Sequence, residues 1–134
     1  MERLKERLAI ARRALATLFD ALSQIKTDMN RDASIQRFEY SFETTWKAAQ
    51  AYLRVVENLQ LASPTAVARQ CFQSSLMSEE QSRTALKMVA DRNLTVHTYD
   101  EELAEQIYSR LPMYARLMKE WLDAIEHKAA GAPS

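Results

Sequence analysis

The sequence contains few of the residues that make tight turns or covalent cross-links. Its 134 residues include one glycine and three prolines. An all-β fold needs many tight turns, so this composition argues against that class. Cys71 is the single cysteine, which excludes a disulfide framework and a cysteine metal cluster.

A surplus of charge and long apolar runs are also absent from the sequence. The 18 basic and 18 acidic residues balance, so the chain lacks the excess of positive charge that is typical of nucleic-acid-binding proteins. A local cluster of basic residues is still compatible with this composition. No run approaches the roughly 20 apolar residues of a membrane span. The charged N-terminal stretch does not resemble a signal peptide. We therefore expect a cytoplasmic protein without a membrane partner.

The residues that are present predict helices along almost the whole chain. The composition, 47% hydrophobic and 27% charged, suits one domain with a single core. Apolar residues recur at steps of three and four. This spacing predicts helices over about 2–26, 30–58 and 64–76, a fourth that fades at 91–93, and a last one to about residue 128. We expect an all-α, up-and-down bundle of five to six helices, with one domain over 1–128 and a disordered tail over 129–134.

Helix boundaries and inward faces can be predicted from local signals. Asn30 and Ser63 are candidate N-caps, and Ser78 with Gln81 forms a capping-box pattern. Thr98 or Asp100 should cap the last helix. Further expectations are an apolar stripe that includes Ile25 in the first helix, an inward Phe72 in the third, and a kink or break at Pro112.

The segment Arg92–His97 lies between two predicted helices and carries chemistry-bearing residues. We expect the preceding helix to end near Asn93 in a left-handed cap, so that the bend brings Arg92 and His97 together. An arginine can hold a phosphate with a bidentate fork, and a histidine can transfer a proton near neutral pH. This pair would suit phosphodiester chemistry. The alternative is an ordinary solvated turn that caps a helix.

The segment RNLTVHTY, residues 92–99, matches the RxxxxHxY motif of HEPN domains. Residues 31–53, RDASIQRFEYSFETTWKAAQAYL, resemble the FExxFExxWK block of the nucleotidyltransferase substrate-binding protein family. SPTAVARQCFQSSL and LPMYARLM follow in the expected order. The resemblance covers roughly residues 4–126.

This resemblance implies a HEPN-like bundle that forms a homodimer, or a heterotetramer with a minimal nucleotidyltransferase partner. In many such toxin–antitoxin pairs the HEPN protein resembles a ribonuclease and the nucleotidyltransferase neutralises it. On this chain Arg92 and His97 would be the catalytic pair, Asn93 a supporting polar residue, and Tyr99 the position that the partner modifies with AMP. The ribonuclease would need neither metal nor other cofactor, and RNA or a nucleotide would be the ligand.

Two other functions stay open at this point. The chain could be a non-catalytic subunit that binds nucleotide or substrate for the nucleotidyltransferase, or it could be an antitoxin-like or purely structural adaptor. Glu39, Glu43 and Lys47 fall in the family block. They are either a solvated helix face or, as the resemblance suggests, part of the partner interface or the wall of the site. Acids near His97 are expected in a first helical turn anyway, so a metal site is not expected.

Overall fold

The computed structural model describes residues 1–132, and helices account for most of this part of the chain. The α-helices are α1 (Glu2–Leu22), α2 (Asp28–Glu57), α3 (Pro64–Gln73), α4 (Glu79–Leu94) and α5 (Glu101–Ala130), with a short 3-10 turn, η1 (Thr95–His97), between the last two. No strand occurs within residues 1–132. The predicted all-α class is therefore confirmed.

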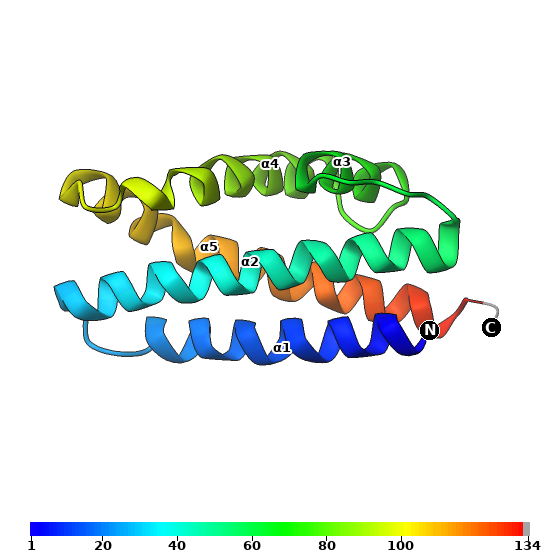
Figure 1. Ribbon diagram of the computed structural model, residues 1–134, viewed down its shortest axis with the longest axis horizontal. Coiled ribbons are helices and arrows are strands. Elements are labelled where there is room, and N and C mark those ends of the chain that lie inside the picture. Colours follow the sequence, from blue (N-terminus) through cyan, green and yellow to red (C-terminus); the bar gives the residue numbers. More distant parts are fainter. Residues whose placement is uncertain (133–134) are drawn as a thin grey trace.

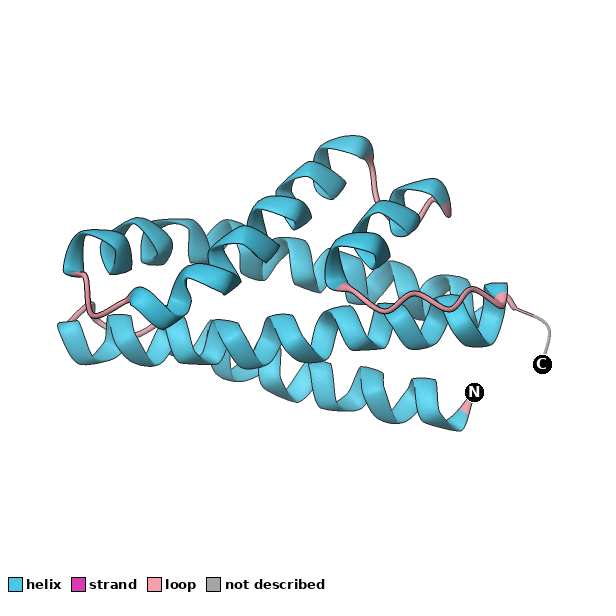
Figure 2. Cartoon of the chain, turned by 45° about the horizontal axis from the view of Figure 1, so that its top comes forward, coloured by secondary structure: helices cyan, strands magenta, loops and turns pink. Residues whose placement is uncertain are grey.

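The helices form an elongated bundle in which α1 runs antiparallel to α2 and α5, while α2 and α5 run in the same direction (Figure 1). α1, α2 and α5 pack together, and the α3–α4 pair lies along one side of them (Figure 1). The α1–α2 loop, η1 and the start of α5 lie at one end of the bundle. The N-terminus and the α2–α3 loop lie at the opposite end (Figure 1). That loop, residues 58–63, is the long extended connection visible in Figure 2.

Aromatic side chains of α2 and α5 fill the centre of the bundle. Phe38 and Tyr114 are both fully buried and stack with their ring centroids 5.5 Å apart. Phe42 and Trp46 continue the buried face of α2 at four-residue steps. Burying side chains of this size is the main stabilising contribution in a domain of this length. The four-residue spacing of Phe38, Phe42 and Trp46 therefore marks the face of α2 that lies in the core.

Several helix boundaries follow from capping chemistry. Ser63 accepts a hydrogen bond from the Ala66 backbone N–H, and Ser78 and Gln81 form the reciprocal capping box. Asp100, rather than Thr98, caps α5. The prediction of Asn30 as the cap of α2 is wrong: Thr27 accepts the Asn30 backbone N–H at 3.0 Å. A threonine three positions upstream satisfies the free donor, so the helix begins earlier.

Three predictions about helix extent and orientation are corrected. α1 ends at Leu22, so Ile25 lies outside it and is 86% exposed. α3 ends at Gln73, and Phe72 lies on its outer side, 39% exposed. Pro112 does not divide α5. Pro112 is itself exposed, so solvent can reach the backbone around the missing hydrogen bond and the helix continues.

The C-terminal end departs a little from the predicted boundary. α5 continues to Ala130, two residues into the predicted tail, and residues 133–134 of that tail lie outside the described part of the chain. Among the described residues, no helix combines the length and the apolar character that crossing a membrane requires.

Candidate functional site

The RxxxxHxY segment spans the junction between α4 and α5. Arg92 lies in the last turn of α4, His97 is the final residue of η1, and Tyr99 lies in the turn before α5. The junction occupies one extreme end of the bundle (Figure 1). A chain reversal at this point presents the segment to solvent on several sides.

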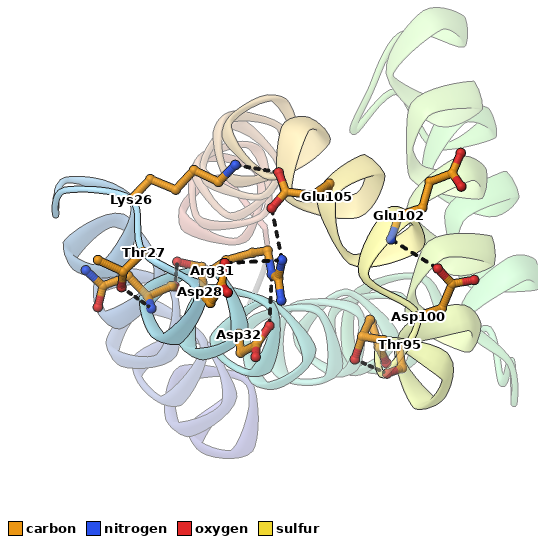
Figure 3. Close-up of polar contacts among 12 residues, drawn as sticks. Lys26, Thr27, Asp28, Arg31, Asp32, Thr95, Asp100, Glu102 and Glu105 are labelled. Atoms are coloured by element: carbon orange, nitrogen blue, oxygen red, sulfur yellow. Dashed lines mark hydrogen bonds and ion pairs between the residues drawn. The ribbon is translucent and has the colours of Figure 1, made fainter.

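Threonine hydroxyls hold the junction in shape. Thr95 is 4% exposed, and its hydroxyl donates to the Arg92 carbonyl at 2.8 Å. The Thr98 hydroxyl donates to the Thr95 carbonyl at 2.9 Å. Asp100 then accepts the backbone N–H groups of Glu102 at 3.0 Å and Leu103 at 3.3 Å (Figure 3). These bonds satisfy backbone groups that a helix end leaves free, so the turn is defined without a glycine.

His97 and Tyr99 lie together on this surface. The Nδ1 atom of His97 is 3.3 Å from the Tyr99 hydroxyl, and the two rings meet edge to face with centroids 5.9 Å apart. His97 is exposed and Tyr99 is 82% exposed. Both groups are therefore accessible to a large ligand or to a second protein.

Arg92 approaches this pair less closely than predicted. α4 continues through Asn93 to Leu94, and Asn93 does not adopt the predicted left-handed conformation. The predicted bend at Asn93 is wrong because the 3-10 turn extends the helical path instead. No hydrogen bond within residues 1–132 joins Arg92 to His97 or Tyr99. Its Nε atom is buried without a hydrogen-bond partner in this part of the chain. Asn93 is exposed beside it.

A buried ionic cluster lies directly before the motif and was missed from the sequence. Asp91 is 4% exposed, and it accepts two hydrogen bonds from Arg110, at 2.6 Å from Nε and 3.0 Å from an Nη atom. The Tyr114 hydroxyl donates to the same carboxylate at 2.5 Å. This bidentate geometry fastens the end of α4 to the middle of α5. The cluster therefore fixes the backbone from which Arg92 projects.

The cluster also changes the proton affinity of its members. Burial, followed by the hydrogen bond to Asp91, raises the pKa of Tyr114 above its ordinary value. The hydrogen bond to Asp91 likewise raises the pKa of Arg110. A signal for the cluster exists in the sequence. An acid in the last turn of a helix opposes the helix dipole, and Arg110 and Tyr114 share one face of α5 four residues apart.

A second ionic network stabilises the same end of the molecule. Arg31 is 4% exposed and donates to Asp32 and Glu105, both at 3.0 Å (Figure 3). Lys26 also pairs with Glu105, so the α1–α2 loop and α2 are both joined to the first turns of α5. Hydrogen bonds from Lys26 and then Arg31 lower the pKa of the Glu105 carboxyl.

The residues predicted as partner interface or site wall lie on α2. Glu43 and Lys47 form an ion pair at 3.3 Å, and both side chains are about 40% exposed. Glu39 is half-buried one turn earlier. No hydrogen bond or ion pair within residues 1–132 connects these three side chains to the α4–α5 junction. They are accessible to a partner, and they form a region separate from the His97–Tyr99 contact.

Other candidate groups give little chemistry. Within residues 1–132, no group of three or more His, Cys, Asp or Glu side chains is arranged to hold a metal ion. Cys71 is fully buried, and this burial raises the pKa of its thiol to about 12. The thiol therefore stays protonated near neutral pH, and Cys71 is part of the hydrophobic core.

The fold and the polar junction define a class: a helical bundle with an accessible Arg…His–Tyr segment between its last two helices. The family model described as nucleotidyltransferase substrate binding protein like matches residues 6–127. The chain belongs to this family. The resemblance found in the sequence is thereby confirmed. No curated protein sequence matches the chain.

Solved structures share the fold. A protein of Thermus thermophilus is 52% identical, with a TM-score of 0.83 over 86% of this chain and 98% of that chain. A Haemophilus influenzae protein, described as the substrate-binding domain of a nucleotidyltransferase, is 19% identical (TM-score 0.77, 89% of this chain and 98% of that chain). A tri-AMPylated HEPN toxin of Shewanella oneidensis, solved with an MNT antitoxin, is 20% identical (TM-score 0.75, 92% and 96%).

Proposed function

We propose that this chain is the HEPN-type component of a two-protein module with a minimal nucleotidyltransferase, and that it is a metal-independent ribonuclease neutralised by that partner. The observation that carries the proposal is the exposed contact between His97 and Tyr99. Arg92 lies five residues before His97 in the sequence. Family membership supports the partner, and the similarity to the Shewanella toxin, solved in complex with its antitoxin, supports the toxin–antitoxin relationship.

The proposed reaction uses His97 for proton transfer and Arg92 for charge. The ribose 2′-hydroxyl loses its proton, and its oxygen forms a bond to phosphorus. The bond from phosphorus to the 5′-oxygen breaks, and the leaving 5′-oxygen receives a proton. An imidazole can serve as the base or as the acid in this exchange. The Arg92 guanidinium would hold the phosphate through two parallel hydrogen bonds and stabilise charge in the transition state.

A second copy of the chain would complete this site. A single chain supplies one histidine, His97, to this site, whereas the reaction benefits from both a base and an acid. A two-fold axis near the α4–α5 junction would bring two copies of Arg92 and His97 together. The exposed junction, with Val96 at 67% exposure, is accessible for such a contact, and Asn93 would lie beside the phosphate as a supporting polar group.

Tyr99 is the proposed control point. Its hydroxyl would attack the α-phosphorus of ATP bound to the nucleotidyltransferase, and pyrophosphate would leave. The resulting AMP ester would place a bulky anion next to His97 and close to Arg92, which would exclude the RNA phosphate by charge and volume. Glu39, Glu43 and Lys47 would contribute to the surface that the partner contacts.

The second candidate is a non-catalytic subunit that binds nucleotide or substrate for the nucleotidyltransferase. Its support is the absence, within residues 1–132 of one chain, of any direct hydrogen bond between Arg92 and His97. In this case the motif would recognise a phosphate without cleaving its ester.

RNA cleavage by the purified chain, with and without the nucleotidyltransferase and ATP, tests the two candidates. The proposal expects cleavage by the chain alone and inhibition after modification. Arg92→Lys should lose most activity because a point charge cannot replace the bidentate fork. Tyr99→Phe should cleave normally and escape inhibition, whereas Tyr40→Phe, which changes another exposed tyrosine, should still be inhibited. A wild-type chain that binds the partner but cleaves no RNA would favour the binding subunit.

A further inference from the structure

The end of the bundle opposite the motif contains a hollow lined by arginines. Arg3 and Arg7 come from the first two turns of α1, and Arg54 comes from the last turn of α2. Residues 59–62 of the α2–α3 loop line its other side. The hollow has a volume of about 410 Å³, which lies in the range of about 300–1,000 Å³ typical of small-molecule sites.

The positive charge in this hollow is not neutralised by the protein. No aspartate or glutamate lines it, and none of the ion pairs formed within residues 1–132 involves Arg3, Arg7 or Arg54. The chain as a whole carries no net charge. Three arginines without acidic partners around one concave surface are therefore a local departure from an otherwise balanced surface.

A structural role explains only part of the arrangement. A basic residue in the last turn of a helix suits the helix dipole, which accounts for Arg54. The helix dipole does not explain Arg3 and Arg7, because they line the same hollow from α1 and not from the end of α2. Arg7 is half-buried, and its guanidinium forms no ion pair within residues 1–132. An anionic ligand would supply that missing ionic partner.

The remaining walls suit a ring system. Ala51, Leu59 and Leu61 contribute apolar surface. The Gln50 side-chain amide donates to the Leu61 carbonyl at 2.7 Å, which holds the loop wall against α2. A planar base can lie on such a surface or on a guanidinium plane, while the remaining guanidinium groups hold phosphate oxygens through paired hydrogen bonds.

The surroundings favour a compact ligand over a polymer. An RNA strand would need basic residues that continue along its path. Here the adjoining surface of α1 carries Glu2 and Glu6 next to Arg3 and Arg7, so the positive surface is interrupted on that side. The positive region is confined to a hollow of small-molecule size.

We propose that Arg3, Arg7 and Arg54 bind a small phosphorylated ligand of the nucleoside-phosphate class at this hollow. The site is separate from the α4–α5 junction and goes beyond the proposed ribonuclease function. It would make the bundle sensitive to a nucleotide at one end while the motif operates at the other.

Calorimetric titration of the full chain with ATP, AMP, adenosine and inorganic phosphate, at 0.15 M salt to screen non-specific attraction, tests the site. ATP should bind more tightly than inorganic phosphate because the apolar wall accepts the base. The R7Q/R54Q double variant should bind ATP at least tenfold more weakly, since it removes two of the three guanidinium groups that would hold the phosphate oxygens. The R13Q/R69Q control removes the same charge from two exposed arginines outside the hollow and should bind normally.

Three outcomes of the ATP and phosphate titrations would overturn the proposal. They are no ATP binding by the wild type at millimolar concentration, equal ATP binding by R7Q/R54Q and the wild type, and binding of inorganic phosphate as tight as that of ATP. Binding of an acidic peptide or an RNA oligonucleotide in place of ATP would also overturn it and identify a macromolecular ligand. Circular dichroism melting of each variant establishes that it is folded. RNA cleavage by R7Q/R54Q reports separately on the motif, so the two proposals can fail independently.

Discussion

Asp91 and His97 lie only six residues apart, but their surroundings are opposite. Asp91 is buried, and its carboxylate receives hydrogen bonds from Arg110 and Tyr114. His97 is exposed, and its one side-chain hydrogen bond within residues 1–132 is the long 3.3 Å approach to the Tyr99 hydroxyl. A group whose hydrogen bonds are all satisfied inside the protein contributes rigidity. A group at the surface whose hydrogen-bonding capacity is not used within the protein remains available to a ligand or a modifying enzyme.

The comparison assigns different tasks to neighbouring residues of one segment. The Asp91 cluster and the Thr95 hydroxyl bond hold the end of α4 and the 3-10 turn in place. His97 and Tyr99 then project from a fixed backbone, so their own contacts need not stabilise the fold. Changes at Asp91 should therefore affect stability, and changes at His97 should affect function.

The largest expected effect on stability comes from Asp91→Ala. The substitution leaves Arg110 without its carboxylate and Tyr114 with a buried, unpaired hydroxyl. Breaking one side of a buried ionic cluster should lower the free energy of unfolding by about 3 kcal/mol. Urea denaturation followed by circular dichroism measures this. Asp123→Ala, at an exposed acid that pairs with Arg12 and Lys119, is the control and should cost less than about 1 kcal/mol. A loss at Asp91 no larger than the control would contradict the anchoring role.

Tyr114→Phe should have a smaller effect at neutral pH, about 1–2 kcal/mol, because Asp91 keeps Arg110. It should also change the alkaline limb of the stability curve. The folded-state pKa of Tyr114 is raised, so the fold favours the neutral phenol. That contribution is complete below the unfolded pKa of about 10 and declines as pH rises toward the folded pKa. Unfolding free energies measured from pH 8 to 11 should fall less steeply in the variant, and parallel curves would argue against the raised pKa.

Glu105→Gln tests the second network at the same end. Lys26 and Arg31 lower the folded-state pKa of Glu105. Its contribution is therefore present above the unfolded pKa of about 4.3 and is lost as pH falls through the lower folded value. The variant should be less stable than the wild type at pH 6, and this difference should shrink toward pH 3. A difference that does not change with pH would show that the charge of Glu105 is not responsible.

The mildest change in stability among the ionic pairs should follow Glu43→Gln. Its exposed pair with Lys47 spans four residues of one helix, and such pairs contribute about 0.3–0.5 kcal/mol. Sedimentation or calorimetry with the nucleotidyltransferase then distinguishes the two interpretations of this surface. A partner interface predicts weaker association at unchanged melting temperature, whereas a solvated helix face predicts no change in either quantity.

The sequence predicted the regular parts of this fold because local chemistry determines them. Ser63, Ser78 with Gln81, and Asp100 cap helices as expected, since each satisfies nearby backbone N–H groups. The wrong predictions concern helix boundaries that are determined by a residue other than the one the pattern indicated. Thr27 replaces Asn30 as a cap, and the end of α4 continues through Asn93 because a 3-10 turn follows it.

The candidate site was predicted in its composition but not in its geometry. The motif pattern identified Arg92, His97 and Tyr99, and the structure brings His97 and Tyr99 into contact. The position of Arg92 depends on Asp91, which pairs with a residue 19 positions later in the chain. No helical periodicity encodes such a tertiary contact. It follows from how α4 packs against α5.

The most direct test of the division between anchoring and functional residues combines RNA cleavage with thermal melting for His97→Ala. His127→Ala changes the other exposed histidine, in the last turn of α5, and serves as the control. We predict that His97→Ala abolishes cleavage while its melting temperature stays within about 2 °C of the wild type, because it removes few buried contacts. His127→Ala should retain both properties. Full cleavage by a folded His97→Ala protein, or its unfolding together with the loss of activity, would contradict the account.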